Sequence, residues 1–304
     1  MTKKEMSERL TSVVSSFINY SEMVLPLDVR EKLEELEKCE KKPLQKALYE
    51  AMRNNQKKAL ELRRPSCQDT GVIQFWIKCG SSFPALGVLE ESLREAVRRS
   101  TDTLPLRPNT VETFGEYNTG TNVASGAPTV WWDIIPDSDR CELYVYAAGG
   151  GCSLPGKAMV LMPGAGYEGI VDFVLDQTAL YGPNACPPLF IGVGVGNSSE
   201  VAALNAKKAL MRPVGSHNDN EKAAEMERLL EDALNTLNIG PQGLGGNRSV
   251  MGVNVVNSAR HPATLGVAVA FGCWSFRRGV LTFDSSLNAE SSTHPGWKAE
   301  GGEI

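Results

Sequence analysis

The sequence predicts a mixed α/β fold, in which a helical N-terminal part is followed by interleaved strands and helices that form one large domain. Apolar residues recur at helical spacing through residues 1–63. From Pro65 onward, glycine, asparagine and proline become frequent, and β-rich runs alternate with helical runs. Neither an internal repeat nor a low-complexity linker divides the 304 residues. We therefore expect one domain over 1–304, with a helical part at 1–63, a body at 64–284 and a polar tail at 285–304. The alternative is a chain of two lobes, although no boundary between them stands out in the sequence.

Amphipathic helices are expected in the first part, over residues 7–24, 28–40 and 41–64. The first of them places apolar side chains on one face, at Leu10, Val13, Val14 and Phe17. Pro43 suits the first turn of the third helix, because that turn needs no backbone N–H donor. These segments carry dense charge on the opposite face, and no catalytic chemistry is visible in them.

The body alternates strands and helices. Strands are expected over 71–79, 128–136, 141–148, 188–195, 249–256 and 264–272. Helices are expected over 89–100, 168–181, 198–211 and 218–238. The stretch VGVGNSSE, residues 193–200, has glycines between a strand and a helix but lacks the third glycine of a dinucleotide-binding loop. It predicts tight packing of strand against helix.

Composition and charge restrict the class of protein. Hydrophobic residues make up 42% of the chain and charged residues 22%, which is ordinary for a globular protein with a sizeable core. A net charge of −5 argues against nucleic acid or a membrane surface as the partner. The first 20 residues lack the apolar run of a secretory signal, and no stretch reaches the roughly 18 apolar residues of a membrane span. Seven cysteines then indicate reduced thiols in the cytoplasm.

Three of the cysteines lie in loops that proline or glycine makes rigid. They are Cys67 in PSCQDTG, Cys186 in NACPPLF and Cys273 in FGCWSFRRG. The remaining four are read as structural thiols, although Cys152, which follows three glycines, is harder to assign. The absence of any CxxC pair argues against a zinc finger and against the cysteine run of ferredoxins. Spacing alone leaves open whether the three loop cysteines meet at one metal centre.

Six motifs in a fixed order go beyond spacing. They are RPSCQDTG, the glycines of AAGGGCSLPGK, NACPP, IGPQGLGG, ARHPAT and GCWSFRRG. Together they resemble the class I, iron–sulfur fumarase family, and the resemblance covers nearly the whole chain up to Gly279. Fumarases of this class tend to read KGGGSENKS where this chain reads AGGGCSLPGK. That departure favours the branch of the family that dehydrates tartrate, and it puts substrate contacts beyond Gly151 in doubt.

The resemblance implies a cofactor. In that family three cysteines hold a [4Fe–4S] cluster, and the matching positions are Cys67, Cys186 and Cys273. Electron-transfer clusters usually have four cysteine ligands, so three leave one iron open to act as a Lewis acid. The implied reaction is the dehydration of tartrate to oxaloacetate, with an enol as the intermediate.

The resemblance also assigns roles in catalysis. Asp69 and His261 are the candidate acid–base residues. The alternative role of Asp69 is an Asx turn that caps its loop together with Thr70, and both roles can coexist. A lone histidine such as His261 is otherwise usually structural.

Further residues are expected to bind substrate. Gln68 is a candidate amide for orienting it, and Arg107, between two prolines, is suited to a bidentate grip on a carboxylate. The alternative for Arg107 is a surface residue that caps its loop. Gly149–Gly151 let backbone N–H groups approach an anion, with Gly150 and Gly151 as contacts and Ser153 and Lys157 as further candidates. Arg277 and Arg278 either tune the cluster or hold the loop.

A partner chain is expected as well. Single-chain members of the family carry a C-terminal domain with more substrate-binding arginines and a catalytic threonine, whereas the residues after Gly279 read as a short strand and a polar tail. A separate β subunit is therefore expected to complete the active site around a small dicarboxylate, as an α2β2 assembly. The alternatives are a class I fumarase α subunit, a non-catalytic zinc-binding subunit, and a cysteine hydrolase that uses Cys67 with His261.

Overall fold

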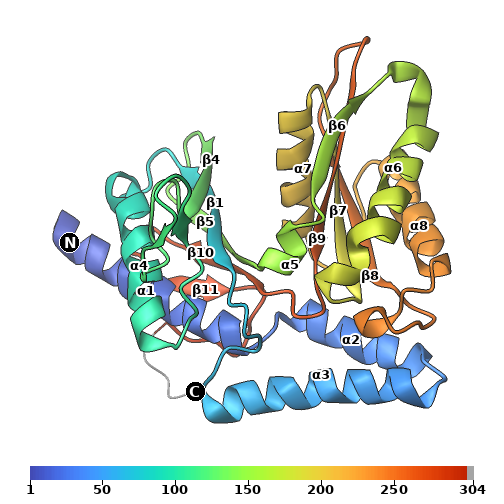
Figure 1. The fold of residues 1–304 in the computed structure, drawn as a ribbon. Coiled ribbons are helices and arrows are strands. Elements are labelled where there is room, and N and C mark those ends of the chain that lie inside the picture. Colours follow the sequence, from blue (N-terminus) through green and yellow to red (C-terminus); the bar gives the residue numbers. More distant parts are fainter. Residues whose placement is uncertain (300–304) are drawn as a thin grey trace. The chain divides into compact units, whose positions relative to one another are not determined.

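The computed structural model describes residues 1–299, and its contacts group the chain into two compact units. Unit 1 comprises Met1–Leu27, Asn55–Gly149 and the segment from Arg277 onward, and unit 2 comprises Asp28–Asn54 and Gly150–Phe276. Each unit has its own sheet (Figure 1). Each also has its own hydrophobic core. The chain therefore passes four times from one unit to the other. The expected division at residues 63 and 284 stays a prediction.

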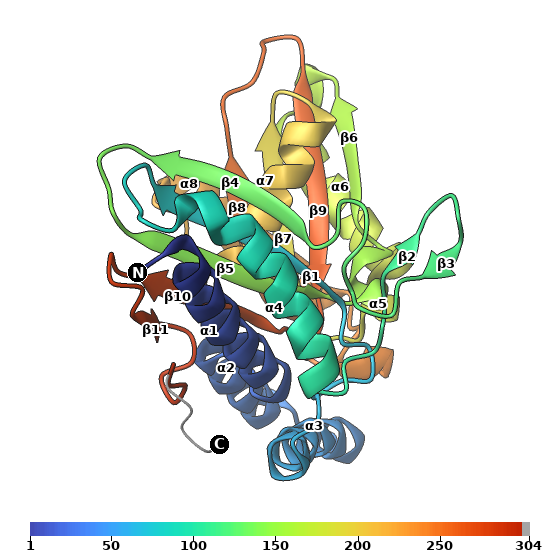
Figure 2. The ribbon, with the colours of Figure 1, turned by 90° about the vertical axis from the view of Figure 1, so that its left-hand side faces the viewer.

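Unit 1 is built on a five-stranded sheet with the strand order β11-β10-β5-β1-β4. Its strands are β1 (Val72–Gly80), β4 (Thr129–Ile135), β5 (Cys141–Ala148), β10 (Arg278–Phe283) and β11 (Ala289–Ser291). β1 pairs in parallel with β4, and the other neighbours in the sheet pair antiparallel. A separate hairpin of two short strands, β2 (Val111–Glu112) and β3 (Tyr117–Asn118), stands away from this sheet in Figure 2.

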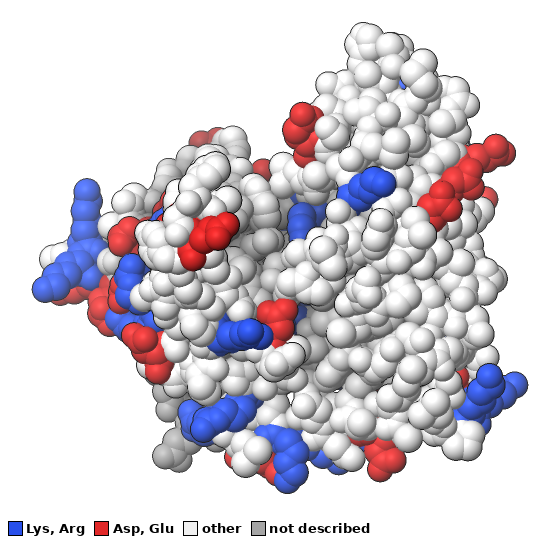
Figure 3. Space-filling model, viewed as in Figure 1, with Lys and Arg blue, Asp and Glu red and all other residues white. Residues whose placement is uncertain are grey.

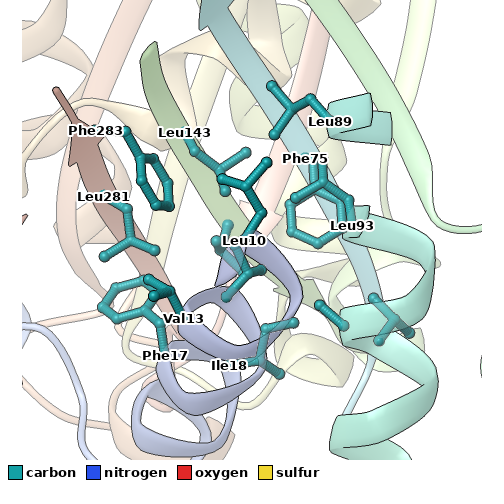
Figure 4. Packing of buried hydrophobic residues seen from close by; sticks show 14 of the residues in the cluster. Leu10, Val13, Phe17, Ile18, Phe75, Leu89, Leu93, Leu143, Leu281 and Phe283 are labelled. Atoms are coloured by element: carbon teal, nitrogen blue, oxygen red, sulfur yellow. The ribbon is translucent and has the colours of Figure 1, made fainter. Parts of the chain in front are cut away.

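Two helices, α1 (Lys3–Met23) and α4 (Leu89–Thr103), pack on the sheet of unit 1. α1 begins at a capping box, in which Thr2 and Glu5 exchange hydrogen bonds between side chain and backbone. Its apolar face then meets the strands, as Figure 4 shows for Leu10, Phe17 and the strand residues around them. The outer surfaces of the two helices carry charges of both signs (Figure 3), and Arg99 pairs there with Glu8.

The segment after β10 is part of this core, although its composition is polar, as expected from residue 285 onward. Trp297 is buried, and its ring packs edge-on against Phe17 with 5.1 Å between the ring centroids. His294 is also buried, and its Nε2 lies 3.0 Å from the carbonyl oxygen of Val24. A few apolar and aromatic residues thus suffice to anchor a segment of polar composition, and residues 300–304 of the expected tail lie outside the described residues.

Unit 2 is built on a four-stranded sheet with the strand order β6-β9-β7-β8. Its strands are β6 (Lys157–Leu161), β7 (Leu189–Gly196), β8 (Val250–Asn257) and β9 (Leu265–Gly272). Its helices are α2 (Leu27–Cys39), the first part of α3 (Pro43–Leu62), α5 (Gly150–Ser153), α6 (Gly166–Tyr181), α7 (Ser199–Met211) and α8 (Glu221–Thr236). In Figure 1, α7 covers one face of the sheet, and α6 and α8 cover the other.

Glycines in β7 allow α7 to lie directly on the sheet. A Cβ built on Gly194 would lie 1.9 Å from the carbonyl oxygen of Ala202, and one built on Gly192 would lie 2.3 Å from that of Ala206. Both carbonyls belong to the backbone of α7, so no side chain fits at either glycine. The prediction that VGVGNSSE packs strand against helix is confirmed.

The mixed α/β class and the helical N-terminal part are confirmed, and every strand and helix expected before Gly279 is present. Short elements such as α5, β6 and the hairpin β2–β3 were not expected, because two to five residues show no clear periodicity. None of the helices in residues 1–299 is both long enough and apolar enough to span a membrane.

Candidate functional site

The loop Arg64–Gly71 joins α3 to β1 in unit 1, and backbone hydrogen bonds fix its first half. The N–H of Ser66 donates to the carbonyl oxygen of Glu22 at 2.8 Å. The carbonyl of Ser66 accepts from Nδ2 of Asn55 at 2.6 Å. Cys67 follows directly and is half-buried. Its backbone position is thus set by α1 and α3, the helices in which the sequence showed no chemistry.

Asp69 forms the Asx turn that was the alternative to its catalytic role. Its Oδ1 accepts the N–H of Gly71 at 3.0 Å and Nδ2 of Asn109 at 3.2 Å. Gly71 has a φ of +73°, and a Cβ there would meet the backbone of Ala148 at 2.8 Å, so the turn requires glycine. The turn holds the carboxylate in one place, which is compatible with a role in proton transfer and does not test it.

Arg107 is held beside this loop through Thr70. The N–H of Arg107 donates to Oγ1 of Thr70 at 3.0 Å, and that hydroxyl donates to the carbonyl of Arg107 at 3.3 Å. The side chains of Arg107 and Gln68 are exposed, and Asp69 is half-buried. Unit 1 therefore places the candidate amide, carboxylate and guanidinium on two adjoining loops.

Arg277 holds the loop Arg64–Gly71 in place through its guanidinium group. Its Nη1 lies 2.6 Å from Oε2 of Glu22, and its Nη2 donates to the carbonyl of Asp69 at 2.7 Å. Arg277 and Glu22 are 3% and 1% exposed, so the pair is buried. Burial raises the pKa of Glu22, and the positive charge of Arg277 opposes that shift. Of the two roles left open for Arg277, the contacts support holding the loop.

The glycines of AAGGGCSLPGK lie where β5 ends and α5 begins. Gly150, Gly151 and Ser153 are exposed residues of this single helical turn, whereas Cys152 is buried within it. A Cβ on Gly151 would lie 3.2 Å from the carbonyl of Asn184, so the turn packs closely on the segment before Cys186. Lys157 is exposed at the start of β6. The substrate contacts expected of these residues stay predictions.

Cys186 and Cys273 lie on adjoining loops of unit 2. The N–H of Trp274 donates to the carbonyl of Cys186 at 3.1 Å, which ties the two loops together. The motif IGPQGLGG supports the first loop from another direction, because the N–H of Gln242 donates to the carbonyl of Pro187 at 2.9 Å. Cys186 is exposed and has a φ of +54°, and Cys273 is half-buried.

His261 lies in the exposed loop between β8 and β9 of unit 2. Its Nδ1 accepts the N–H of Ala263 at 3.1 Å, and its own N–H donates to Oδ1 of Asn197 at 2.9 Å. Because Nδ1 accepts, Nε2 is the ring nitrogen that carries the proton of the neutral side chain. The ring orientation is thus defined, and its role in catalysis stays a prediction.

The expected cluster ligands suit an iron–sulfur group in their chemistry. Cysteine thiolates are the usual ligands of such clusters, and each of the three cysteines sits in a loop held by backbone hydrogen bonds. Cys67 belongs to unit 1, and Cys186 and Cys273 belong to unit 2. Within residues 1–299 the structure assembles no group of three or more His, Cys, Asp or Glu side chains as a metal site. The ligand set therefore stays a prediction.

Sequence reasoning missed Glu22 and Asn109, which support the loop of Asp69, and it did not select Lys207. Glu22 and Asn109 carried no signal of their own, since each acts through contacts with distant loops. Lys207 of α7 is half-buried, and burial lowers the pKa of its ammonium group while nearby Cys152 opposes the shift. A lysine on a helix is usually solvated, so the sequence around Lys207 gave no reason to select it.

Comparisons with known proteins support the family resemblance that the motifs indicate. The family model for fumarate hydratase (Fumerase) matches residues 11–282. The chain is 50% identical over 292 residues to the L(+)-tartrate dehydratase subunit alpha of Escherichia coli (strain K12), and 96% of each chain is covered. The protein of the same description from Shigella boydii serotype 4 shows the same identity and coverage.

Proposed function

The chain belongs to the fumarate hydratase (Fumerase) family, and from this premise we propose that it is the α subunit of an iron–sulfur hydro-lyase. We propose L(+)-tartrate as the substrate, which loses water to give oxaloacetate. The single observation that carries the substrate is the likeness, at half of all aligned positions, to relatives described as tartrate dehydratase subunits. The departure of AGGGCSLPGK from the usual fumarase loop supports the same substrate.

The proposal includes a [4Fe–4S] cluster held by Cys67, Cys186 and Cys273. When bound, such a cluster supplies a Lewis acid at the iron that lacks a cysteine, and this eases the departure of the substrate hydroxyl as water. The hydrogen bonds that fix the cysteine loops support the assignment, because ligands that need no ordering bind a metal centre more strongly.

The residues of the chain have separate tasks in this proposal. The carboxylate of Asp69 accepts the proton from the carbon next to the one that loses its hydroxyl, and His261 is the second candidate for carrying a proton. Arg107 binds a substrate carboxylate through its planar fork, and Gln68 orients the substrate through its amide. The Asx turn at Asp69 and the hydrogen bonds between Thr70 and Arg107 support these tasks, because they hold the groups without further ordering cost.

Four more residues complete the substrate contacts of the proposal. Gly150 and Gly151 present backbone N–H groups at positions without side chains, and Ser153 and Lys157 add a hydroxyl and a positive charge. All four are exposed on or just after α5. A substrate with two carboxylates needs positive or N–H groups at both ends, and Arg107 alone supplies one end.

A β subunit completes the site in this proposal. The relatives are described as alpha subunits, which implies that they work with a further subunit. We propose that the partner contributes additional arginines and a threonine, in an α2β2 assembly located in the cytoplasm. The second candidate function is that of a class I fumarase α subunit, acting on fumarate or malate, and the description of the matching family model favours it.

The test is an anaerobic assay of the complex of both subunits, reconstituted with iron and sulfide, against tartrate, malate and fumarate side by side. Turnover of tartrate well above that of the other two supports the proposal. Turnover of malate and fumarate without tartrate would instead establish the fumarase. A colourless, inactive complex that binds zinc would refute both, since an iron–sulfur protein is brown. Activity that survives in air without iron would point to a thiol hydrolase.

A further inference from the structure

The hairpin β2–β3 of unit 1 exposes apolar side chains in its turn and on its strands. Phe114, in the turn, is fully exposed at 103% of its reference area, and Val111 and Tyr117 are 52% and 59% exposed. Figure 2 shows the hairpin projecting from the body of unit 1. An isolated two-stranded hairpin buries little apolar surface of its own. Exposing a phenylalanine there has an unfavourable solvation energy, and no contact within the hairpin offsets it.

The hairpin is nevertheless a defined structure. Val111 pairs with Asn118 and Glu112 with Tyr117, and the N–H of Glu116 donates to the carbonyl of Glu112 at 2.8 Å. At its root, Nδ2 of Asn118 donates to the carbonyl of Pro108 at 2.7 Å. The backbone that carries the aromatic side chains is therefore ordered, which lowers the entropy cost of inserting them into a partner.

The root of the hairpin adjoins the candidate site. Asn109, two residues before β2, donates through Nδ2 to Oδ1 of Asp69 at 3.2 Å and to the carbonyl of Gly71 at 3.1 Å. Its backbone N–H donates to Oδ1 of Asn122 at 2.7 Å, and Asn122 lies in the segment that follows β3. A chain seated on the hairpin would thus lie next to the two loops that carry Asp69 and Arg107.

The charge of the hairpin narrows the kind of chain that fits. Residues 108–127 contain two glutamates, Glu112 and Glu116, and neither lysine nor arginine. A complementary surface is an apolar recess bordered by basic side chains. A second copy of this hairpin would oppose glutamate to glutamate, which disfavours self-association through it.

We propose that the hairpin β2–β3 is a docking arm for the β subunit, with Phe114 and Tyr117 inserted in an apolar recess of that subunit. This inference rests on the proposed function, which requires a second chain to bring basic groups to the dicarboxylate. The arm places that chain at the loop of Asp69, the position from which its basic groups reach the substrate.

The experiment measures the affinity between this chain, with its cluster reconstituted, and the β subunit of the same organism by biolayer interferometry under nitrogen. Phe114→Ala and Tyr117→Ala are each expected to raise the Kd at least about tenfold, as buried aromatic anchors do at interfaces. The matched control is Tyr167→Ala, which removes an aromatic side chain of similar exposure, 67%, from unit 2. Its Kd is expected to stay within about twofold of the wild-type value.

A second measurement tests the contact directly. A photo-crosslinking phenylalanine analogue at position 114 is expected to couple to the β subunit, and the same analogue at position 167 is not. The proposal is overturned if the hairpin variants lose no more affinity than Tyr167→Ala, if the wild-type chains do not associate, or if position 114 couples to a second copy of this chain. A complex that forms through the hairpin but turns over none of the three acids would refute the proposed function alone.

Discussion

Arg277 connects two parts of unit 1 through one buried side chain. Its guanidinium pairs with Glu22 of α1, donates to the carbonyl of Asp69, and sits four residues after Cys273 in the sequence. Replacing an exposed arginine would change the stability of the fold little. Arg277 is buried, and its charge compensates the buried carboxylate of Glu22. The position of the Asp69 loop therefore depends on a charge that lies outside the site itself.

Arg277→Gln is expected to lower the free energy of unfolding by about 3–5 kcal/mol, because it leaves Glu22 buried without its partner. The measurement is guanidinium unfolding of the chain followed by circular dichroism. Arg99→Gln is the control, since it breaks the exposed pair with Glu8 and should cost no more than about 1 kcal/mol. Equal losses in the two variants would show that the buried pair contributes no more to stability than the exposed pair does.

Lowering the pH should reduce the loss in free energy of unfolding that Arg277→Gln causes. Burial raises the pKa of Glu22, and removing the positive charge that opposes this shift raises it further. A carboxyl with a folded-state pKa above its unfolded value binds the proton more tightly when folded, so its contribution to stability is present at low pH and lost as the pH rises through that pKa. The gap between variant and wild type should thus be smaller at pH 5 than at pH 8, and a gap that widens on acidification would contradict this.

Cys186 provides the direct test of the ligand assignment. Cys186→Ala is expected to bleach the visible absorbance of the reconstituted protein and to abolish turnover, because the cluster loses a ligand. Cys39→Ala, on the last residue of α2, should change neither. Absorbance and iron content per chain are the measurements, and a complete cluster spectrum in Cys186→Ala would remove this residue from the ligand set.

At the scale of elements, the contact between β7 and α7 depends on glycine. Gly194→Ala would push a methyl group into the backbone of α7, and it is expected to destabilise the chain by about 3 kcal/mol, the upper end of typical overpacking costs. Gly87→Ala is the control, because a Cβ there meets nothing within 4 Å. Thermal unfolding of both variants distinguishes them, and a Gly194→Ala variant as stable as Gly87→Ala would show that α7 moves aside without cost.

The elements that the sequence predicts are those with a long periodic pattern. Runs such as CELYVYAA or LEESLREAVRRS contain enough alternation to define a strand or a helix before any contact is known. The hairpin has two-residue strands, and Trp297 stands in a polar segment, so their structures depend on contacts that only the folded chain makes. The same holds for the site: its motifs are readable, but the partners of Asp69 and Cys186 are tertiary.

At the scale of the whole molecule, the proposed cluster predicts sensitivity to air. An iron that no cysteine holds is exposed to oxidants, so aeration of the complex with the β subunit should remove it and abolish turnover. Ferrous iron with a thiol, added under nitrogen, should restore most of the activity. The measurements are turnover and visible absorbance before aeration, after it and after repair. Full activity after prolonged aeration would refute a catalytic role for iron.

The four passages of the chain between its units have a consequence for synthesis. Every residue of unit 2 has left the ribosome once Phe276 has emerged, whereas unit 1 still lacks β10, the strand that pairs with β5. Until then one edge of β5 is open to pairing with other nascent chains. The first helix likewise waits for Trp297 to cover Phe17. The unit made first is thus completed last, and a shorter gene product ending at Gly149 would lack two strands, β10 and β11, and part of its core.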